Sequence, residues 1–143
     1  MVTPTSRRRF DENGKSVNTH GDYPDAVRWV AAKENVPLIE LNGMTAILFN
    51  ALGVDNSTKA FVHYPAGTFP GQTRTLKDNT HFSTYGAYEV SKCVIEGMKK
   101  ADLEIVKYLR PDYSGFDPAQ PDSFESFKWN LGSFTENEKP DGN

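Results

Sequence analysis

Asp78 and His81 stand three residues apart in the polar stretch 78–83, just ahead of a run with helical apolar periodicity. If the backbone makes a helical turn here, side chains at positions i and i+3 face the same side. The carboxylate of Asp78 could then accept a hydrogen bond from Nδ1 of His81 and leave Nε2 free as a base. Such a pair is the base and the orienting carboxylate of a Ser-His-Asp hydrolase, and it needs a nucleophile to activate.

The spacing alone also fits a simpler explanation, in which Asp78 is a helix N-terminal cap near a surface histidine. The wider block is more informative. Residues 78–87 read Asp-Asn-Thr-His-Phe-Ser-x-x-Gly-Ala, which resembles the last conserved block of the SGNH (GDSL-type) hydrolases, and within them the rhamnogalacturonan acetylesterase group. In that family the Asp and His of this block complete a catalytic triad. The resemblance therefore implies Asp78 and His81 as catalytic residues.

The resemblance covers about residues 2–110. Residues 3–10 look like the loop after the family's fourth strand, residues 20–28 like the start of the next helix, and residues 36–41 like the fifth strand. It implies an α/β fold, the C-terminal part of a three-layer α/β/α SGNH-hydrolase (flavodoxin-like) fold. The family's first three strands would lie outside this chain, so its sheet would be incomplete.

Other landmarks of the family are absent from the sequence. It contains no Gly-Asp-Ser block with a nucleophile, no glycine block and no Gly-x-Asn-Asp block for the oxyanion hole. Gly21-Asp22 is followed by Tyr23, and no Gly-x-Ser-x-Gly elbow occurs. We therefore predict the C-terminal half of a serine-type carbohydrate O-acetyl esterase, and we expect this chain alone to be inactive.

Composition argues against several functional classes. The chain has 143 residues and a net charge of −3, with one short basic cluster at residues 7–9, so we expect no nucleic-acid binding. No apolar run is long enough to span a membrane, and the N-terminus lacks the apolar segment of a signal peptide. The family resemblance nevertheless implies a secreted or periplasmic protein.

We expect no cofactor and no metal. His20, His63 and His81 are widely spaced and form no ligand motif, so a zinc site is not expected. The single Cys93 cannot form an internal disulfide and is expected to be a small packed side chain.

The resemblance implies an acetylated pectic polysaccharide as the substrate. Because rhamnogalacturonan is anionic, the arginines at 7–9 could bind its carboxylates through paired hydrogen bonds. A solvated basic loop explains at least two of them equally simply, and we predict none of the three as a site residue.

The hydrophobic pattern predicts the order strand, helix, strand, helix, helix, which is typical of an α/β layer arrangement. We expect strands at 1–5 and 38–41, the second with Leu38, Ile39 and Leu41 as candidate core residues, helices at 22–35 and 44–53, and an ordered aromatic loop at 59–72. Asp22 could cap the first of these helices. The longest helix should begin after Ser83 or Thr84, either of which could cap it. Gly97 could kink this helix, and Asp102 could cap a second segment through Leu109. The first helix should bury Ala26, Val27, Val30 and Ala31. In the longest helix we expect Val90, Val94 and Met98 to be exposed, because they would pack on strands absent from this chain. That surface should bind the missing half or promote self-association. The alternative is that the aromatic tail, from Phe116 to Phe134, folds back and covers this face.

We assign residues 1–112 to the hydrolase half and residues 113–143 to a C-terminal extension. The extension contains aromatic residues whose large apolar surface favours burial, namely Phe116, Phe124, Phe127, Trp129 and Phe134. We expect it to fold back on the domain. Two alternatives to the esterase remain open at this point. One is a non-catalytic, truncated hydrolase relic or interaction module, and the other is a polysaccharide-binding module that uses these aromatic residues.

Overall fold

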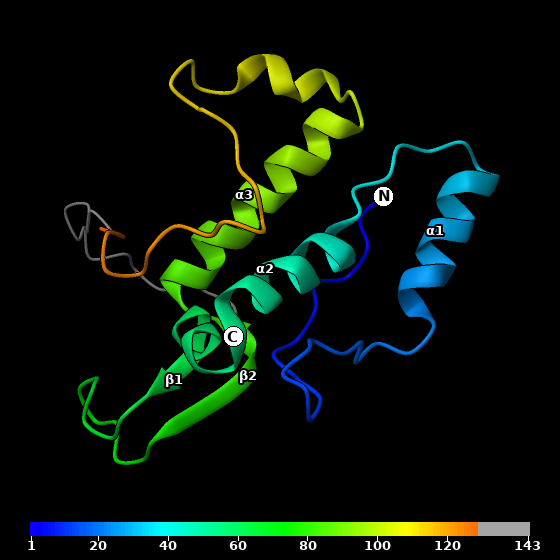
Figure 1. The fold of residues 1–143 in the computed structure, drawn as a ribbon. Coiled ribbons are helices and arrows are strands. Elements are labelled where there is room, and N and C mark those ends of the chain that lie inside the picture. Colours follow the sequence, from blue (N-terminus) through cyan, green and yellow to red (C-terminus); the bar gives the residue numbers. More distant parts are fainter. Residues whose placement is uncertain (129–143) are drawn as a thin grey trace, which may run out of the picture.

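Two helices, α2 (Leu41–Asn56) and α3 (Thr84–Lys100), pack together at the centre of the fold (Figure 1). The structure is a computed structural model that describes residues 1–128. The other elements are α1 (Tyr23–Lys33), the short 3-10 helices η1 (Ser57–Ala60) and η2 (Glu104–Tyr108), and the strands β1 (Phe61–Tyr64) and β2 (Leu76–Phe82). The chain is thus a mixed helix and strand structure with a small, antiparallel two-stranded sheet.

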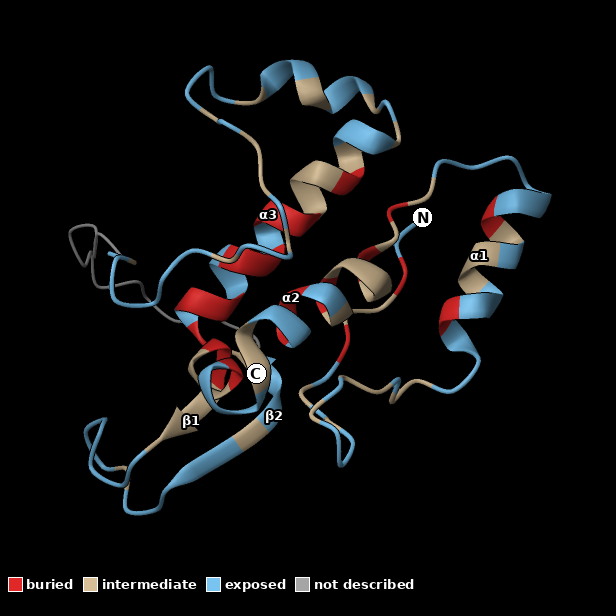
Figure 2. Ribbon diagram, in the orientation of Figure 1, coloured by how far each residue is buried: buried red, intermediate tan, exposed pale blue. Residues whose placement is uncertain are grey.

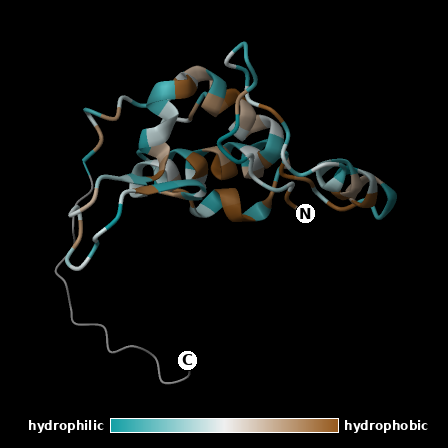
Figure 3. Cartoon of the chain, turned by 90° about the horizontal axis from the view of Figure 1, so that it is seen from below, coloured by the Kyte–Doolittle hydropathy of each residue, from teal (hydrophilic) through white to brown (hydrophobic). Residues whose placement is uncertain are grey.

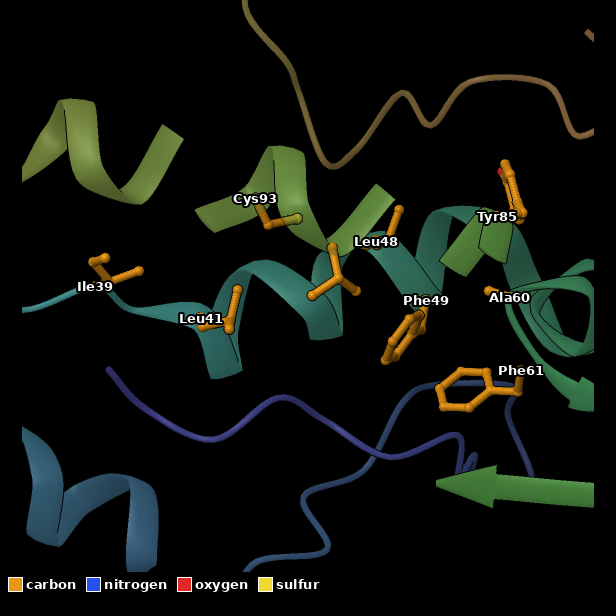
Figure 4. Packing of buried hydrophobic residues seen from close by; sticks show 9 residues of the cluster. Ile39, Leu41, Leu48, Phe49, Ala60, Phe61, Tyr85 and Cys93 are labelled. Carbon is orange, nitrogen blue, oxygen red and sulfur yellow. The ribbon is translucent and has the colours of Figure 1, made fainter. Parts of the chain in front are cut away.

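A cluster of apolar side chains is buried where α2, α3, η1 and β1 meet (Figures 2 and 4). Leu48, Phe49 and Cys93 are completely buried, and the ring centroids of Phe49 and Phe61 lie 5.1 Å apart. Fully burying one such side chain contributes about 1.5–3 kcal/mol. Figure 3 shows the same gathering of hydrophobic residues between the helices, with hydrophilic residues along the outer loops.

The apolar face predicted to be exposed on the longest helix is not exposed. Val90 is buried, and Val94 and Met98 pack against the core cluster. The prediction was wrong because it assigned this face to absent strands, whereas α2 of the same chain covers it. Exposed apolar side chains occur instead at Val2 and at Ile47 of α2.

Two glycines allow α3 to approach its neighbours closely. A Cβ atom at Gly86 would lie 1.8 Å from the carbonyl oxygen of Ala60, and one at Gly97 would lie 2.4 Å from Cγ2 of Ile39. The close approach of α3 to Ala60 therefore explains why a glycine, Gly86, follows the Asp-x-x-His stretch. Gly97 does not kink the helix, as had seemed possible from the sequence, but makes room for Ile39.

The two predicted strands at 1–5 and 38–41 do meet in parallel. The amide of Thr3 donates to the carbonyl of Ile39 (3.0 Å), and the amide of Ile39 donates to the carbonyl of Met1 (2.9 Å). The pairing is an isolated bridge between Val2 and Ile39 rather than a pair of strands. The strand prediction at 38–41 was too long because α2 already begins at Leu41.

The hairpin corrects two sequence predictions. Residues 61–64, placed in an aromatic loop, form β1, and residues 78–82, placed in a polar loop, belong to β2. The run Phe-Val-His-Tyr has the aromatic and β-branched composition of a strand, whereas the prolines at 65 and 70 lie beyond it, in the connection. Within the described residues the two strands pair only with each other.

Helix boundaries were predicted in part. Ser83 caps α3 by accepting a hydrogen bond from the amide of Gly86 (3.1 Å), as expected, whereas Asp22 makes no side-chain cap at α1. The longest helix ends at Lys100, and the second segment predicted through Leu109 is present as the 3-10 helix η2. Asp102 does not cap it, because Asp102 adopts a left-handed conformation (φ 49°) and the N-cap residue of η2 is Leu103. In α1 only Ala31 of the predicted stripe is fully buried, and Ala26 is exposed.

The described part of the C-terminal extension packs back on α3, as its aromatic residues predicted. The Tyr85 ring makes edge-to-face contacts with Phe124 and Phe127, and its hydroxyl donates to the carbonyl of Asp122 (2.7 Å). Trp129 and Phe134 lie outside the described residues. The division of the chain at residue 112 stays a prediction.

Candidate active site

Asp78 and His81 lie in a bulge of β2. Phe82 pairs with Phe61 and Lys77 pairs with His63, so residues 78–81 lie opposite Val62 alone. Such bulges bend a strand and re-aim its side chains, and they are common next to active sites. The bulge places the carboxylate and the imidazole on the same side.

The predicted contact between the two side chains is present. Oδ2 of Asp78 lies 2.6 Å from Nδ1 of His81. The geometry arises differently from the helical turn that the spacing suggested. Oδ1 of Asp78 accepts hydrogen bonds from the amides of Thr80 (2.7 Å) and His81 (3.0 Å), which is an Asx turn inside the strand.

These three interactions also determine the charge of Asp78. The hydrogen bond from His81, followed by the two backbone amides, lowers the pKa of the carboxyl group from 3.8 to about 2. Asp78 is therefore ionised at neutral pH and is an acceptor only. A carboxylate at Nδ1 favours the tautomer that carries its proton there, which leaves Nε2 of His81 as the basic nitrogen.

The imidazole of His81 is open to solvent, with 77% of its side chain exposed, against 37% for Asp78. Within residues 1–128 no serine hydroxyl hydrogen-bonds to this ring. The serine nearest in sequence, Ser83, donates instead to the carbonyl of Lys59 (2.6 Å) and caps α3. The described chain therefore supplies a base and its orienting carboxylate, with no serine hydroxyl hydrogen-bonded to the base.

Two residues beside the pair were not found by sequence reasoning. Asn79, between the two candidate catalytic residues, accepts a hydrogen bond at its Oδ1 from Nη1 of Arg8 (3.1 Å), and the same oxygen lies 2.8 Å from Nε2 of His63. The amide of Arg8 also donates to the carbonyl of Asn79 (2.9 Å). Arg8 was grouped with its neighbours as a basic loop, and no local signal distinguishes it, because its partners lie 46 to 71 residues away.

A cavity of about 420 Å³ lies next to this network. Its wall is mainly aromatic, from Phe61, Tyr64 and Tyr85, and His63 and Lys59 add polar groups. A mainly apolar concavity with a few polar groups is the usual form of a small-molecule site. Ser83, two residues after His81, also lines it.

The remaining candidates for chemistry lie elsewhere. The ring of His20 contacts the carbonyl of Thr5 (2.8 Å), and burial raises the pKa of the Cys93 thiol to about 12, which makes it a poor nucleophile. Residues 1–128 contain no group of three or more His, Cys, Asp or Glu side chains that could hold a metal ion. No helix in this part of the chain is long and apolar enough to cross a membrane.

Two curated proteins are similar to this chain. Rhamnogalacturonan acetylesterase RhgT of Bacillus subtilis (strain 168) is 42% identical over 109 residues, which are 76% of this chain and 47% of RhgT. The probable rhamnogalacturonan acetylesterase YesY of the same organism is 31% identical over 109 residues, 76% of this chain and 46% of YesY. The chain spans about half the length of the curated relatives it matches. No family model and no solved structure matches it.

Proposed function

We propose that this chain is the Asp–His portion of a serine-type carbohydrate O-acetyl esterase. Its homology to rhamnogalacturonan acetylesterases confirms the resemblance stated from its sequence. The observation that carries the proposal is the 2.6 Å contact between Oδ2 of Asp78 and Nδ1 of His81. The serine and the oxyanion donors would come from polypeptide outside this sequence. The substrate would be an acetylated pectic polysaccharide, proposed from the names of the relatives.

In the proposed reaction, Nε2 of His81 takes the proton from the serine hydroxyl as its oxygen attacks the acetyl carbonyl. The resulting imidazolium is stabilised by the ionised Asp78. It then gives the proton to the departing sugar oxygen, which leaves an acetyl-enzyme. Water, deprotonated in turn by His81, releases acetate and restores the serine. General base assistance of this kind contributes typically 10²–10⁴-fold to the rate.

The exposure of His81 supports this assignment. Nε2 of His81 has no hydrogen-bond partner within residues 1–128, so it is free to accept a proton from a serine hydroxyl. The aromatic cavity beside the pair, with Tyr64 and Lys59 in its wall, is the proposed place for the sugar ring that carries the acetyl group.

We also propose that the complete protein has the three-layer α/β/α arrangement. The segment at residues 1–3 pairs in parallel with residues 37–39 on one side, and Val2 is 48% exposed. The opposite edge is where the family's remaining strands would add. A parallel pair on its own is too small to be stable, so further strands would stabilise it.

A chimera tests the function. The 109 residues of RhgT that match this chain are replaced by the matching residues of this chain, and acetate release from acetylated rhamnogalacturonan is measured. We expect activity that falls by at least 10³-fold in the His81→Ala variant and less in the Asp78→Asn variant. A folded chimera that releases acetate equally well without His81 would contradict the proposal. A folded chimera with no activity would favour the non-catalytic relic instead.

A further inference from the structure

Arg8 joins three parts of the chain that are far apart in sequence. Its Nε donates to the hydroxyl of Ser57 (3.0 Å), its Nη2 to the carbonyl of Val54 (2.6 Å), and its Nη1 to Oδ1 of Asn79 (3.1 Å). Its backbone amide donates to the carbonyl of Asn79 (2.9 Å). The N-terminal segment is thereby attached both to the end of α2 and to the bulge of β2.

In the bulge, several residues of β2 face a single residue of β1, so regular strand pairing constrains it less than it constrains the flanking pairs. Between the Phe82 and Lys77 pairs, residues 78–81 face only Val62 of β1. Besides the Asx turn of Asp78, the side chain of Arg8 and the ring of His63 both hold the bulge at Asn79. Asn79 is the residue next to Asp78, so its orientation affects where the carboxylate points.

The chemistry of the guanidinium suits this role. It is planar, permanently charged and presents its donors in a fixed fork, so it can hold three acceptors in a defined relation. A lysine at the same place would offer a compact ammonium group without the fork. Ser57 is completely buried, so the end of α2 gives the fork a rigid base.

We infer that Arg8 is a positioning residue for the Asp78–His81 pair and acts through Asn79. It touches neither member of the pair, and its effect is to keep the bulge in the conformation in which the carboxylate meets Nδ1 of His81. The catalytic meaning of this role rests on the proposed function, but the positioning itself is measurable without any turnover.

The neighbouring arginines provide matched controls. Arg7 and Arg9 are exposed, and neither side chain makes a hydrogen bond or ion pair with the rest of residues 1–128. Arg7→Gln and Arg9→Gln therefore remove the same charge as Arg8→Gln from the same short stretch. Only Arg8→Gln also removes the fork.

The test measures the tautomer of His81 in the isolated, ¹⁵N-labelled chain. Ring ¹⁵N shifts, assigned by the signal lost in His81→Ala, report which nitrogen carries the proton when the ring is neutral. We expect protonation at Nδ1 in the parent chain and in both control variants. In Arg8→Gln we expect a shift toward protonation at Nε2, in the same direction as in Asp78→Asn. Exchange of the Thr80 and His81 amides, which donate to Asp78, should rise about tenfold, as expected for losing one net hydrogen bond.

The inference is overturned if Arg8→Gln leaves the ring shifts and the amide exchange as in the parent while Asp78→Asn changes them. If Arg8→Gln does not fold, Asn79→Ala takes its place, because it keeps the bonds from Arg8 to Ser57 and Val54. An Asn79→Ala chain with unchanged readouts would equally overturn it. In the chimera, Arg8→Gln should lower kcat more than it changes KM. An inactive parent chimera would count against the proposed function, whereas an unchanged tautomer would count against the role of Arg8.

Discussion

Two groups of charged side chains in this molecule differ in how completely their own chain surrounds them. Glu89 and Lys92 of α3 are 0% and 8% exposed at their side chains, and Nζ of Lys92 lies 2.8 Å from Oε1 of Glu89 and 2.8 Å from Oδ2 of Asp122. The Asp78–His81 pair has a contact of similar length, but its histidine is 77% exposed. In the buried group each side chain contacts an opposite charge, whereas the exposed pair leaves Nε2 of His81 without a partner in residues 1–128.

The difference indicates different tasks. Removing charges from water is costly, so the buried group persists only because its members compensate one another. It fastens the C-terminal extension to α3, since Asp122 belongs to the extension and Phe116 lies against the Lys92 ammonium at 4.1 Å. The exposed pair fastens nothing to the core. Its carboxylate is held by an Asx turn, and its open ring nitrogen is what the proposed role as a base requires.

Gly86 lies between the two regions in the sequence, and substituting it should strongly destabilise the fold. Gly86→Ala would place a methyl group 1.8 Å from the backbone oxygen of Ala60, which cannot move away without displacing η1. We expect a loss of about 3 kcal/mol or more in the free energy of unfolding, despite the better helix propensity of alanine. Gly97→Ala meets a movable side chain, Ile39, and should cost about 1–2 kcal/mol. Urea denaturation measures the free energy of unfolding of both variants. Equal losses would show that the contact with the Ala60 backbone is not what makes Gly86→Ala destabilising.

The buried group is tested next. Lys92→Met leaves Glu89 buried with its negative charge uncompensated, and we expect it to lower the free energy of unfolding by about 3–5 kcal/mol. Lys99→Met is the matched control, because Lys99 pairs with Glu96 at the same spacing on the same helix but is 40% exposed. It should cost less than about 1 kcal/mol. Similar losses from both variants would show that burial of the Glu89–Lys92 pair does not make it more important for stability than the exposed Glu96–Lys99 pair.

The two regions should also respond to pH in opposite directions. Burial raises the pKa of the Glu89 carboxyl above its usual 4.5, with the Lys92 partner opposing this. The folded chain then binds more protons at Glu89 than the unfolded chain does, so stability falls as pH rises through the range above 4.5.

Asp78 behaves in the reverse manner, since its pKa is lowered from 3.8 to about 2. Its stabilising contribution is complete above pH 4 and is lost as pH falls toward 2. Carboxyl ¹³C titration of the two residues in the folded chain checks both directions. A Glu89 midpoint below that of Asp78 would contradict the burial argument.

The smallest expected effect on stability comes from the candidate base itself. His81→Ala removes an exposed ring, so we expect the free energy of unfolding to change by no more than about 0.5 kcal/mol. Thermal unfolding of the isolated chain measures it. A loss of 2 kcal/mol or more would show that His81 is part of the framework of the fold and would weaken the functional assignment.

Features set by neighbouring residues could be predicted from the sequence, and features set by distant ones could not. The contact between Asp78 and His81, the cap at Ser83 and the burial of Ile39 all follow from local spacing, and the structure contains them. The residue identities predicted the contact even though the assumed helical turn was wrong. An Asx turn brings positions i and i+3 together as well.

Two other misses depend on tertiary contacts. The packing of Val90 on α2 instead of on absent strands depends on how the chain completes its own core. The selection of Arg8 from three adjacent arginines depends on Val54, Ser57 and Asn79, which no pattern within residues 7–9 reveals. Periodicity reports that a face is apolar or a loop is basic, but it does not identify the partner.

The central claim is that His81 activates a serine that this chain does not itself supply. A fluorophosphonate that reacts with activated serines, applied to the RhgT chimera and followed by mass spectrometric mapping, tests it most directly. We predict one labelled serine, located in the part derived from RhgT, and loss of that label in His81→Ala. Labelling of a serine within this chain, or labelling that persists at full rate without His81, would contradict the account.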